Sequence, residues 1–551
     1  MTKKLVLAVA MAMVGAGLMV AAATASSTAK AKPAKATSHH AKTGGTLKTE
    51  LNSDLDYADP QLDYYQPGWE MQYATEVKLF NFPDKNGAAG KQLVPEGAAG
   101  FPIISKNGRT YTFKIRPGFR FSDGKPVTSA NYAYAMQRSL NPKMSAPGAQ
   151  FLTDIVAGAD AYNSGKASSV SGIKTPNAST LVISLIKPAP DLIARMSMAF
   201  FSATSLSLPI DPAGVNTYPS AGPYYLASRT PNRQMILKLN PFYKGNRPHN
   251  WSTIDMEIGN SLDTIQLDVE SGKSDYAEDG LNATAYAQLA QKYGVNKGQF
   301  WSLPILGIRY LAMNHDRPLF KNNPGLAKAV NWAIDRHALA IQSGAFAGKR
   351  NDLILPPGIN GYIDHHFYPN NPNFTVAKKL AKGNTRDGNA TLITSNTTAS
   401  LNQAAIYQYD LKQIGLNVSV KPFTRGVQIR TESVRGAAFD LTTEGWLADY
   451  ADPFDFINIL LDGSNLTPDN NVNVAYYNNP KYVAQMHKAA VLTGAARYKA
   501  YGLLDQSITG NDPAWAVRAD INERLFFSKR IGCVTFPLGL GLVSLGALCQ
   551  K

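Results

Sequence analysis

The stretch EGWLADYADPFDFI, residues 444–457, gathers the residues most capable of chemistry in this chain. It places Trp446 close to three aspartates, Asp449, Asp452 and Asp455. Carboxylates at this density fit several kinds of structure: a solvated turn, a metal-binding loop, a pair of acids that catalyse hydrolysis, or a socket for a cation. The stretch alone does not distinguish them, so the rest of the chain has to decide.

An exported hydrolase is the enzymatic interpretation of these acids. It would use Asp449, Asp452 and Asp455 as acid and base, because paired carboxylates are what glycosidic cleavage requires. The three acids share one loop, however, whereas a glycosidase places its two groups on either side of the scissile bond. The chain also contains no serine or cysteine nucleophile motif and no HExxH helix. We therefore expect a protein that is not an enzyme and keep the hydrolase as a remote alternative.

Other reactive residues are sparse. The histidine pairs at 39–40 and 365–366 lack the ligand spacing of a zinc site, and we predict no metal and no cofactor. Lysines and arginines are scattered and form no stripe with aromatic residues, which argues against nucleic-acid binding despite a formal net charge of +15. The two cysteines, Cys533 and Cys549, either form a disulfide, worth ~3 kcal/mol, or remain two thiols.

The elements before the acidic stretch predict a sheet that positions it. Residues 390–423 contain a strand, a capped helix that ends at Gly415 and a second strand. This βαβ unit implies a right-handed crossover and a largely parallel local sheet. A further strand, FDLTTEG, leads directly into the acidic stretch. The acids therefore lie at the carboxyl end of a strand, where open α/β sheets present ligands.

Hydrophobic periodicity predicts further elements along the chain. Strands are expected over residues 46–51, 111–115, 235–239, 254–258 and 307–314. Helices are expected over residues 128–140, 264–272 and 323–342. In the last of these, Asn323 offers a cap and Pro324 the first helical position, and apolar residues from Leu326 to Ile341 share one face.

The N-terminus has the pattern of an export signal. Lys3 and Lys4 precede an apolar run and a small-residue cleavage site, so we expect residues 1–25 to be a signal peptide, the alternative being an uncleaved membrane anchor. Residues 26–43, rich in Ala and Lys and containing Pro33, are expected to form a disordered basic tether. No cysteine near the cleavage site offers lipid attachment. The protein is therefore expected to be exported to the periplasm or the cell surface.

Six blocks of sequence occur in an order that is similar to a known family. They are GGTLKTEL, YTFKIRPGFRFSDGKPVTSANYAYAMQR, SAGPYYLASRTPNRQMILKLNPFYKG, AMNHDRPLFKNNPGLAKAVNWAIDR, PPGINGY and GWLADYADPFDFI. Together they resemble the extracytoplasmic solute-binding proteins of peptide-type ABC importers, the dipeptide- and oligopeptide-binding family 5. The resemblance extends from about residue 44 to about residue 461.

This resemblance implies an α/β fold of the periplasmic-binding-protein type. Two lobes would be joined by two crossover segments and would close on a ligand in the cleft between them, with an extra domain inserted in the first lobe. Lobe I would comprise residues 44–80, 205–302 and 505–551. The inserted domain would comprise residues 81–204, and lobe II residues 303–504.

The resemblance also places the segment GWLADYADP in the cleft. Asp449 would bind a ligand amine, because a carboxylate in a poorly hydrated cleft accepts charge-assisted hydrogen bonds from an ammonium. Trp446 would pack on the ligand, and Tyr450 is a further candidate for ligand contact. Asp452 is instead expected to shape the turn, and Asp455 to cap the helix that follows.

The sequence departs from the family at the other end of the ligand. Some peptide-binding members carry an Arg shortly before the Trp to hold the ligand carboxylate, but Thr443 and Glu444 stand there. Arg425 and Arg435 are the nearest candidates, and either could be a surface residue. The C-terminal run FPLGLGLVSLGALCQK also differs from the polar ending expected of the family, and it is too short and too rich in glycine for a membrane span.

These points predict a substrate-binding receptor of an ABC importer. It would capture short peptides outside the cytoplasmic membrane by hinge closure and deliver them to the permease. The missing carboxylate anchor leaves an alternative, a receptor of the same family for an oligosaccharide, an opine or a nickel complex. The expected partners are the ligand and the permease subunits in the membrane, with no nucleic acid, and the protein is expected to be a monomer.

Overall fold

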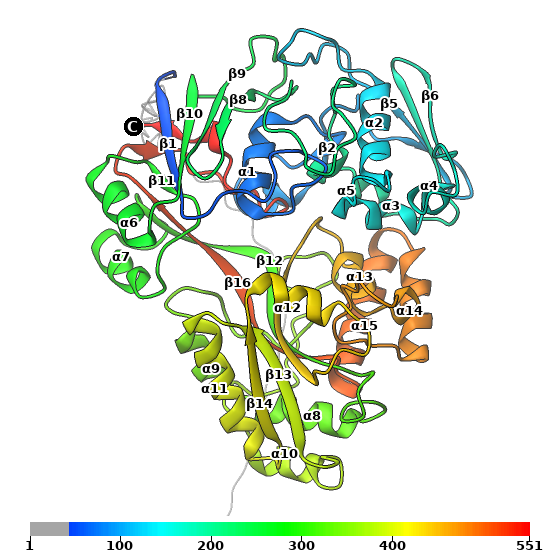
Figure 1. Cartoon of the computed structure of the whole chain (residues 1–551), viewed down its shortest axis with the longest axis vertical. Helices are drawn as coiled ribbons and strands as arrows, with labels where there is room; N and C mark the ends of the chain where they lie inside the picture. Colours follow the sequence, from blue (N-terminus) through cyan, green and yellow to red (C-terminus); the bar gives the residue numbers. More distant parts are fainter. Residues whose placement is uncertain (1–42) are drawn as a thin grey trace, which may run out of the picture. The chain divides into compact units, whose positions relative to one another are not determined.

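A ten-stranded mixed sheet runs through the part of the chain that the computed structural model describes, residues 43–551 (Figure 1). Its strand order is β14-β13-β15-β12-β16-β11-β1-β10-β9-β8. The expected signal peptide, and all but the last residue of the expected tether, lie outside the described residues. The strands span β1 Thr46–Leu51, β8 Tyr224–Thr230, β9 Gln234–Leu239, β10 Thr253–Ile258, β11 Tyr276–Ala277, β12 Phe300–Met313, β13 Asn389–Ser395, β14 Asn417–Phe423, β15 Leu441–Leu447 and β16 Trp515–Phe527.

One end of this sheet is built around the first strand. β1 pairs in parallel with β10 and β11, and β9 and β8 continue the sheet in antiparallel fashion. Alternating residues such as Leu47, Leu51 and Met256 are fully buried in its core. The helices α1 (Gln66–Thr75), α6 (Leu262–Ser271) and α7 (Ala285–Tyr293) belong to the same part of the chain.

The other end of the sheet contains the expected βαβ unit. β13 pairs in parallel with β14 and with β15, and α11 (Thr398–Lys412) connects β13 to β14. Leu392, Val418 and Leu441 from the three strands share one buried core with residues of α11. The prediction of a parallel local sheet before the acidic stretch is therefore confirmed.

The two ends are joined by a long antiparallel pair, β12 and β16, which run side by side through the middle of the sheet (Figure 1). Their pairing is regular up to Pro304 opposite Asn522 and resumes at Ile308 opposite Asp520. An advance of four residues along β12 is thus matched by only two residues along β16. Such a bulge bends a strand pair, so this is where the two ends of the sheet can change direction.

A second, smaller sheet lies within the predicted inserted domain. Its four antiparallel strands have the order β4-β5-β7-β6. Phe113 and Leu181 of this sheet pack on Tyr132 of α2 in one buried core. The elements of this region are β2 Phe80–Asn81, β3 Val94–Pro95, β4 Ile103–Ile104, β5 Thr110–Lys114, β6 Ile173–Asn177, β7 Thr180–Ser184, α2 Ser129–Leu140, α3 Gln150–Thr153, α4 Ala159–Asn163 and α5 Leu192–Arg195.

The expected helix over residues 323–342 is wrong, because the chain forms two helices there. α8 (Pro324–Ala333) begins at Asn323 as predicted, but Asp335 starts a new helix, α9 (Arg336–Gln342), by accepting a hydrogen bond from the backbone N–H of Ala338 at 2.8 Å. The change of direction leaves Ile341 68% exposed rather than buried. An N-cap inside an otherwise periodic pattern can end a helix, and here it does.

Further helices belong to the part of the chain predicted to form lobe II. They are α10 Phe374–Ala381, α12 Arg425–Glu432, α13 Phe454–Leu461, α14 Pro480–Ala490 and α15 Gly494–Asn511. The expected border between residues 504 and 505 falls inside α15, whose buried residues Tyr501, Leu504 and Ile508 belong to one core. A single helix in a single core favours a border near the end of α15, at Asn511, and the lobe borders stay predictions.

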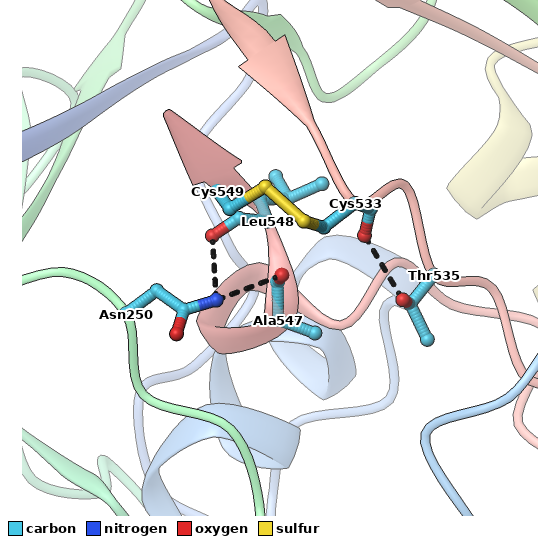
Figure 2. The surroundings of a disulfide bond; sticks show 6 residues. All are labelled: Asn250, Cys533, Thr535, Ala547, Leu548 and Cys549. Carbon is cyan, nitrogen blue, oxygen red and sulfur yellow. Dashed lines mark hydrogen bonds between the residues drawn. A yellow bond between two sulfur atoms is a disulfide. The ribbon is translucent and has the colours of Figure 1, made fainter. Parts of the chain in front are cut away.

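The C-terminus returns to the first end of the sheet. β17 (Ile531–Gly532) pairs with β18 (Cys549–Gln550), and a disulfide joins Cys533 to Cys549 (Figure 2). The choice that the sequence left open, disulfide or free thiols, is thereby decided. No helix among residues 43–551 combines the length and the apolar character needed to cross a membrane.

Candidate ligand-binding site

A cavity of about 650 Å³ lies beside the bulged centre of the sheet. Five segments that are distant in sequence form its wall: the loop and helix after β1, the middle of β12, the region from α12 to the loop just after β15, residues 471–474, and the C-terminal segment before β18. The lining residues used below are Tyr64, Trp69, Arg309, Arg425, Glu444, Trp446, Asp449 and residues 538–542.

Asp449 follows the end of β15 and presents its carboxylate to this cavity. The hydroxyl of Tyr64 donates to both of its oxygens, at 2.9 Å to Oδ1 and 2.8 Å to Oδ2. No Lys, Arg or His among residues 43–551 forms an ion pair with Asp449. Burial raises the pKa of Asp449 to about 7, and the hydrogen bond from Tyr64 offsets part of that rise. The site therefore holds a desolvated carboxylate without a counter-ion.

Trp446 also lines the cavity, and a hydrogen bond to Asp455 holds its indole in place. The indole Nε1 donates to Asp455 Oδ2 at 3.0 Å, and the backbone N–H of Asp449 donates to the same oxygen at 3.1 Å. Asp455 is fully buried, and burial raises its pKa well above the usual range. The expectation that Asp455 caps a helix is wrong, because its side chain instead holds Trp446 and Asp449 in one arrangement.

Asp452 shapes the turn as predicted, since its Oδ1 accepts from the backbone N–H of Phe454 at 2.9 Å. It also accepts from Arg497 Nη2 at 2.7 Å in a buried ion pair. Tyr450, a predicted ligand contact, does not line the cavity. Its ring is fully buried against Phe151, and its hydroxyl donates to Asp191 Oδ2 at 3.1 Å. Tyr450 thus packs into the core of the predicted inserted domain, and we withdraw it as a ligand contact.

The two arginines suggested for a ligand carboxylate are both already paired. Arg425 reaches the cavity wall but binds Glu444 with both terminal nitrogens, Nη1 to Oε1 and Nη2 to Oε2, the latter at 2.9 Å. Arg435 lies outside the lining and pairs with Asp316 at 2.9 Å. Arg435 is therefore withdrawn as a ligand contact, and Arg425 is a wall residue whose two terminal nitrogens each donate to Glu444.

Sequence reasoning missed the aromatic wall opposite Asp449. Tyr64 and Trp69 come from the loop after β1 and the start of α1, and their ring centroids lie 5.8 Å apart. The ring of Phe200 packs against both, with centroid distances of 5.6 Å to Tyr64 and 5.4 Å to Trp69. The run of aromatic residues in DYYQPGW was the available signal, but it could not be assigned to the cavity without knowing that this loop crosses to the end of β15.

The apolar C-terminal run also lines the cavity. Residues 538–542 contribute to the wall, while Phe536, Val543, Leu545 and Leu548 are buried in the core of the first end of the sheet. The disulfide closes this segment into a loop, and Asn250 Nδ2 donates to the carbonyl of Ala547 at 3.0 Å and to that of Leu548 at 3.3 Å (Figure 2). The tail that the sequence left unexplained is thus a wall of the site.

The whole arrangement suits the binding of an organic cation. An uncompensated carboxylate stands at one place in the wall, and indole, phenol and leucine side chains supply apolar surface around it. An ammonium offers donors that match such a carboxylate in charge-assisted hydrogen bonds. The lining drawn from residues 43–551 contains no serine, cysteine or histidine, and its ionisable side chains are carboxylates, tyrosines and arginines.

Comparison with protein families agrees with this description of a binding site. Residues 92–468 match the family model of the bacterial extracellular solute-binding proteins, family 5. The chain is 23% identical over 509 residues to the periplasmic oligopeptide-binding protein OppA of Escherichia coli K12, which covers 87% of this chain and 91% of that protein. It is 25% identical over 388 residues to the oligopeptide-binding protein OppA of Bacillus subtilis 168, which covers 67% of this chain and 69% of that protein.

Solved structures share the fold. A clavulanic acid biosynthesis oligopeptide binding protein 2 superposes with a TM-score of 0.85 at 21% identity, covering 93% of this chain and 96% of that one. OppA of Haemophilus influenzae in complex with RPPGFSPFR gives a TM-score of 0.73 at 18% identity, covering 93% and 99%. The expected α/β fold of two lobes around a cleft is confirmed by these likenesses.

Proposed function

Because the chain belongs to the bacterial extracellular solute-binding proteins of family 5, whose members are binding proteins rather than enzymes, we propose that it is the receptor subunit of an ABC importer. In this proposal it captures a short peptide outside the cytoplasmic membrane and delivers it to the permease subunits. The ligand lies in the cavity between the two lobes and is held there by lobe closure.

The observation that carries this proposal is the carboxylate of Asp449. It lines a cavity of suitable size for a small ligand, its pKa is raised by burial, and Tyr64 is its partner in place of a cation. The ammonium of a peptide would supply the missing positive charge. Trp446 and Trp69 offer flat apolar surfaces on which a peptide backbone or side chain can pack.

A peptide ligand is supported by the relatives. The E. coli and B. subtilis proteins are named as oligopeptide-binding proteins, and the Helicobacter pylori protein DppA, with a TM-score of 0.75, was solved in complex with the peptide STSA. An oligosaccharide, an opine or a nickel complex is the alternative ligand of a receptor with this fold. Mass spectrometry of material that co-purifies with the protein separates these classes.

Export to the periplasm or the cell surface follows from the same proposal. The disulfide between Cys533 and Cys549 supports it, because such bonds persist outside the reducing cytosol. We further propose that residues 81–204 form the inserted domain and that both lobe crossings lie at the β12–β16 bulge. The protein works as a monomer in this scheme, with the permease as its partner in the membrane.

Calorimetric titration with tetraalanine tests the proposal. We expect tetraalanine to bind to the wild type and N-acetyl-tetraalanine not to bind. Asp449→Asn should bind tetraalanine roughly 10- to 100-fold more weakly, which corresponds to the free energy of the charge-assisted hydrogen bonds that the substitution removes. The asparagine still accepts from Tyr64, so the variant is expected to fold. Asp364→Asn changes an exposed aspartate outside the cavity and is the matched control. Equal affinity of the wild type and Asp449→Asn for every free-amine peptide would refute the proposal.

A further inference from the structure

A second unpaired charge lines the cavity, the guanidinium of Arg309 on β12. Arg309 is exposed to the cavity, and no partner for a hydrogen bond or an ion pair exists for its side chain anywhere in residues 43–551. Desolvation in the cavity lowers its pKa to about 10, which leaves the group charged at neutral pH. Arg425 is the other arginine of this wall, and its terminal nitrogens are engaged by Glu444.

The two carboxylates nearest to Arg309 have other partners. Glu444 accepts from Arg425 Nη2 at 2.9 Å and from Gln428 Nε2 at 3.0 Å. Glu523 accepts from Gln66 Nε2 at 3.3 Å. Both raise the pKa of Arg309 through space, but neither forms an ion pair with it, while Arg518 and Arg425 repel it. The guanidinium thus keeps its donors available for a group that enters the cavity.

The local backbone leaves room for this side chain. Arg309 stands directly opposite Gly445 in the β12–β15 ladder, so the two positions share a face of the sheet. A Cβ atom at Gly445 would lie 3.1 Å from Arg309 Cδ and 3.2 Å from Nη1. The arginine therefore lies across the glycine, and any side chain at position 445 would displace it.

The register also sets the separation between Arg309 and Asp449. Arg309 is level with Gly445, and Asp449 comes four residues later, two residues beyond the end of β15. At about 3.4 Å per residue, four residues of extended chain set an upper limit of ~14 Å on the separation of their backbones along the strand. An extended peptide covers about 3.3–3.6 Å per residue, so three to five residues span such a gap.

We propose that Arg309 binds a carboxylate of the ligand at the end of the cavity away from Asp449. A guanidinium suits this role because it can hold a carboxylate with two parallel hydrogen bonds. The carboxylate is either the C-terminus of a peptide of about three to five residues or an acidic side chain of such a peptide. This inference rests on the proposed function, since it assumes that the amine of the same ligand lies at Asp449.

Three peptides with a free amine test the inference: tetraalanine, tetraalanine amide, and Ala-Ala-Ala-Glu amide. Affinities are measured by calorimetry for the wild type, Arg309→Met and Arg435→Met, and thermal melting checks that each variant is folded. Arg435 is paired with Asp316 outside the cavity, which makes it the matched control. Arg309→Lys keeps the positive charge but loses the pair of parallel N–H donors of the guanidinium. We expect its affinity for tetraalanine to lie between those of the wild type and Arg309→Met.

We expect the wild type to bind tetraalanine roughly 10- to 100-fold more tightly than its amide. Arg309→Met should bring the affinity for tetraalanine down to that for the amide and leave the amide unchanged, while Arg435→Met behaves as the wild type. Alternatively, Ala-Ala-Ala-Glu amide, rather than tetraalanine, is the peptide that binds more tightly than tetraalanine amide. If Arg309→Met removes that difference in affinity, the carboxylate comes from a side chain and the inference stands.

Two other results would overturn the inference and are distinguishable from one another. If Asp449→Asn weakens binding of all three peptides while Arg309→Met weakens none, Arg309 is not the anchor and the proposed function stands. If no free-amine peptide binds to the wild type, the proposed function and this inference fall together.

Discussion

At the scale of single residues, recognition of an amine depends on the charge of Asp449, and that charge depends on pH. Burial raises the pKa of Asp449 from its ordinary value to about 7. Below pH 7 a growing share of the free protein carries the neutral acid, so an ammonium ligand must release that proton to bind. The affinity for tetraalanine is therefore expected to rise from pH 5 to pH 7, by up to about tenfold per pH unit.

This pH dependence has a clear signature in the variants. The carboxylate of the peptide is fully ionised over the same range, and its amine begins to lose its proton only near pH 8. Calorimetry of Asp449→Asn between pH 5 and pH 7 should give a flat profile at a lower affinity. A wild-type affinity that stays constant, or falls, over this range would contradict the assignment of the ammonium to Asp449.

Asp449 and Trp446 could be predicted from sequence, because one continuous segment contains both of them and the strand before it. Tyr64 and Arg309 could not, since each belongs to a different segment and only the tertiary fold brings them to the same cavity. Tyr450 was mistaken for a ligand contact because it is adjacent to Asp449. Successive residues point in different directions, and the Tyr450 ring enters the core of the proposed inserted domain.

At the scale of elements, the C-terminal loop is a wall of the site that depends on one covalent bond. The disulfide joins residues 16 positions apart, and residues 538–542 between them line the cavity. Replacing both Cys533 and Cys549 by serine should lower the free energy of unfolding by about 3 kcal/mol, because the unfolded chain regains the entropy of the open loop. Peptide affinity should fall as well, because the wall becomes less ordered.

Denaturant unfolding and peptide titration of the double variant measure both effects. Wild-type protein treated with a reductant provides the control, since it should approach the behaviour of the double variant. Unchanged unfolding and unchanged affinity would mean that packing of Phe536, Val543 and Leu545 alone holds this loop.

The elements themselves were largely predictable because their signals are local. The strands at Thr46–Leu51 and Gln234–Leu239 and the helix at Ser129–Leu140 have clear periodicity and clear ends. Prediction failed where a local signal competed with the pattern, as when Asp335 started a new helix.

At the scale of the whole molecule, the site is divided between the two proposed lobes. Tyr64 and Trp69 belong to proposed lobe I, and Trp446 and Asp449 to lobe II. β12 and β16 join the two through a bulge, at which Ile305 and Leu306 also line the cavity. A ligand held by both walls binds better when they approach each other, and this difference in affinity favours the closed arrangement.

Small-angle scattering tests whether the ligand closes the lobes. The radius of gyration of the wild type is expected to decrease when tetraalanine is added to saturation, because the peptide bridges Asp449 to the wall that carries Tyr64 and Trp69. Asp449→Asn at the same peptide concentration should show little or no decrease, since its weaker affinity leaves most of the protein free. A radius that stays constant in the saturated wild type would show that the peptide enters a rigid cavity. The β12–β16 bulge would then be a fixed bend, and capture would not require a hinge.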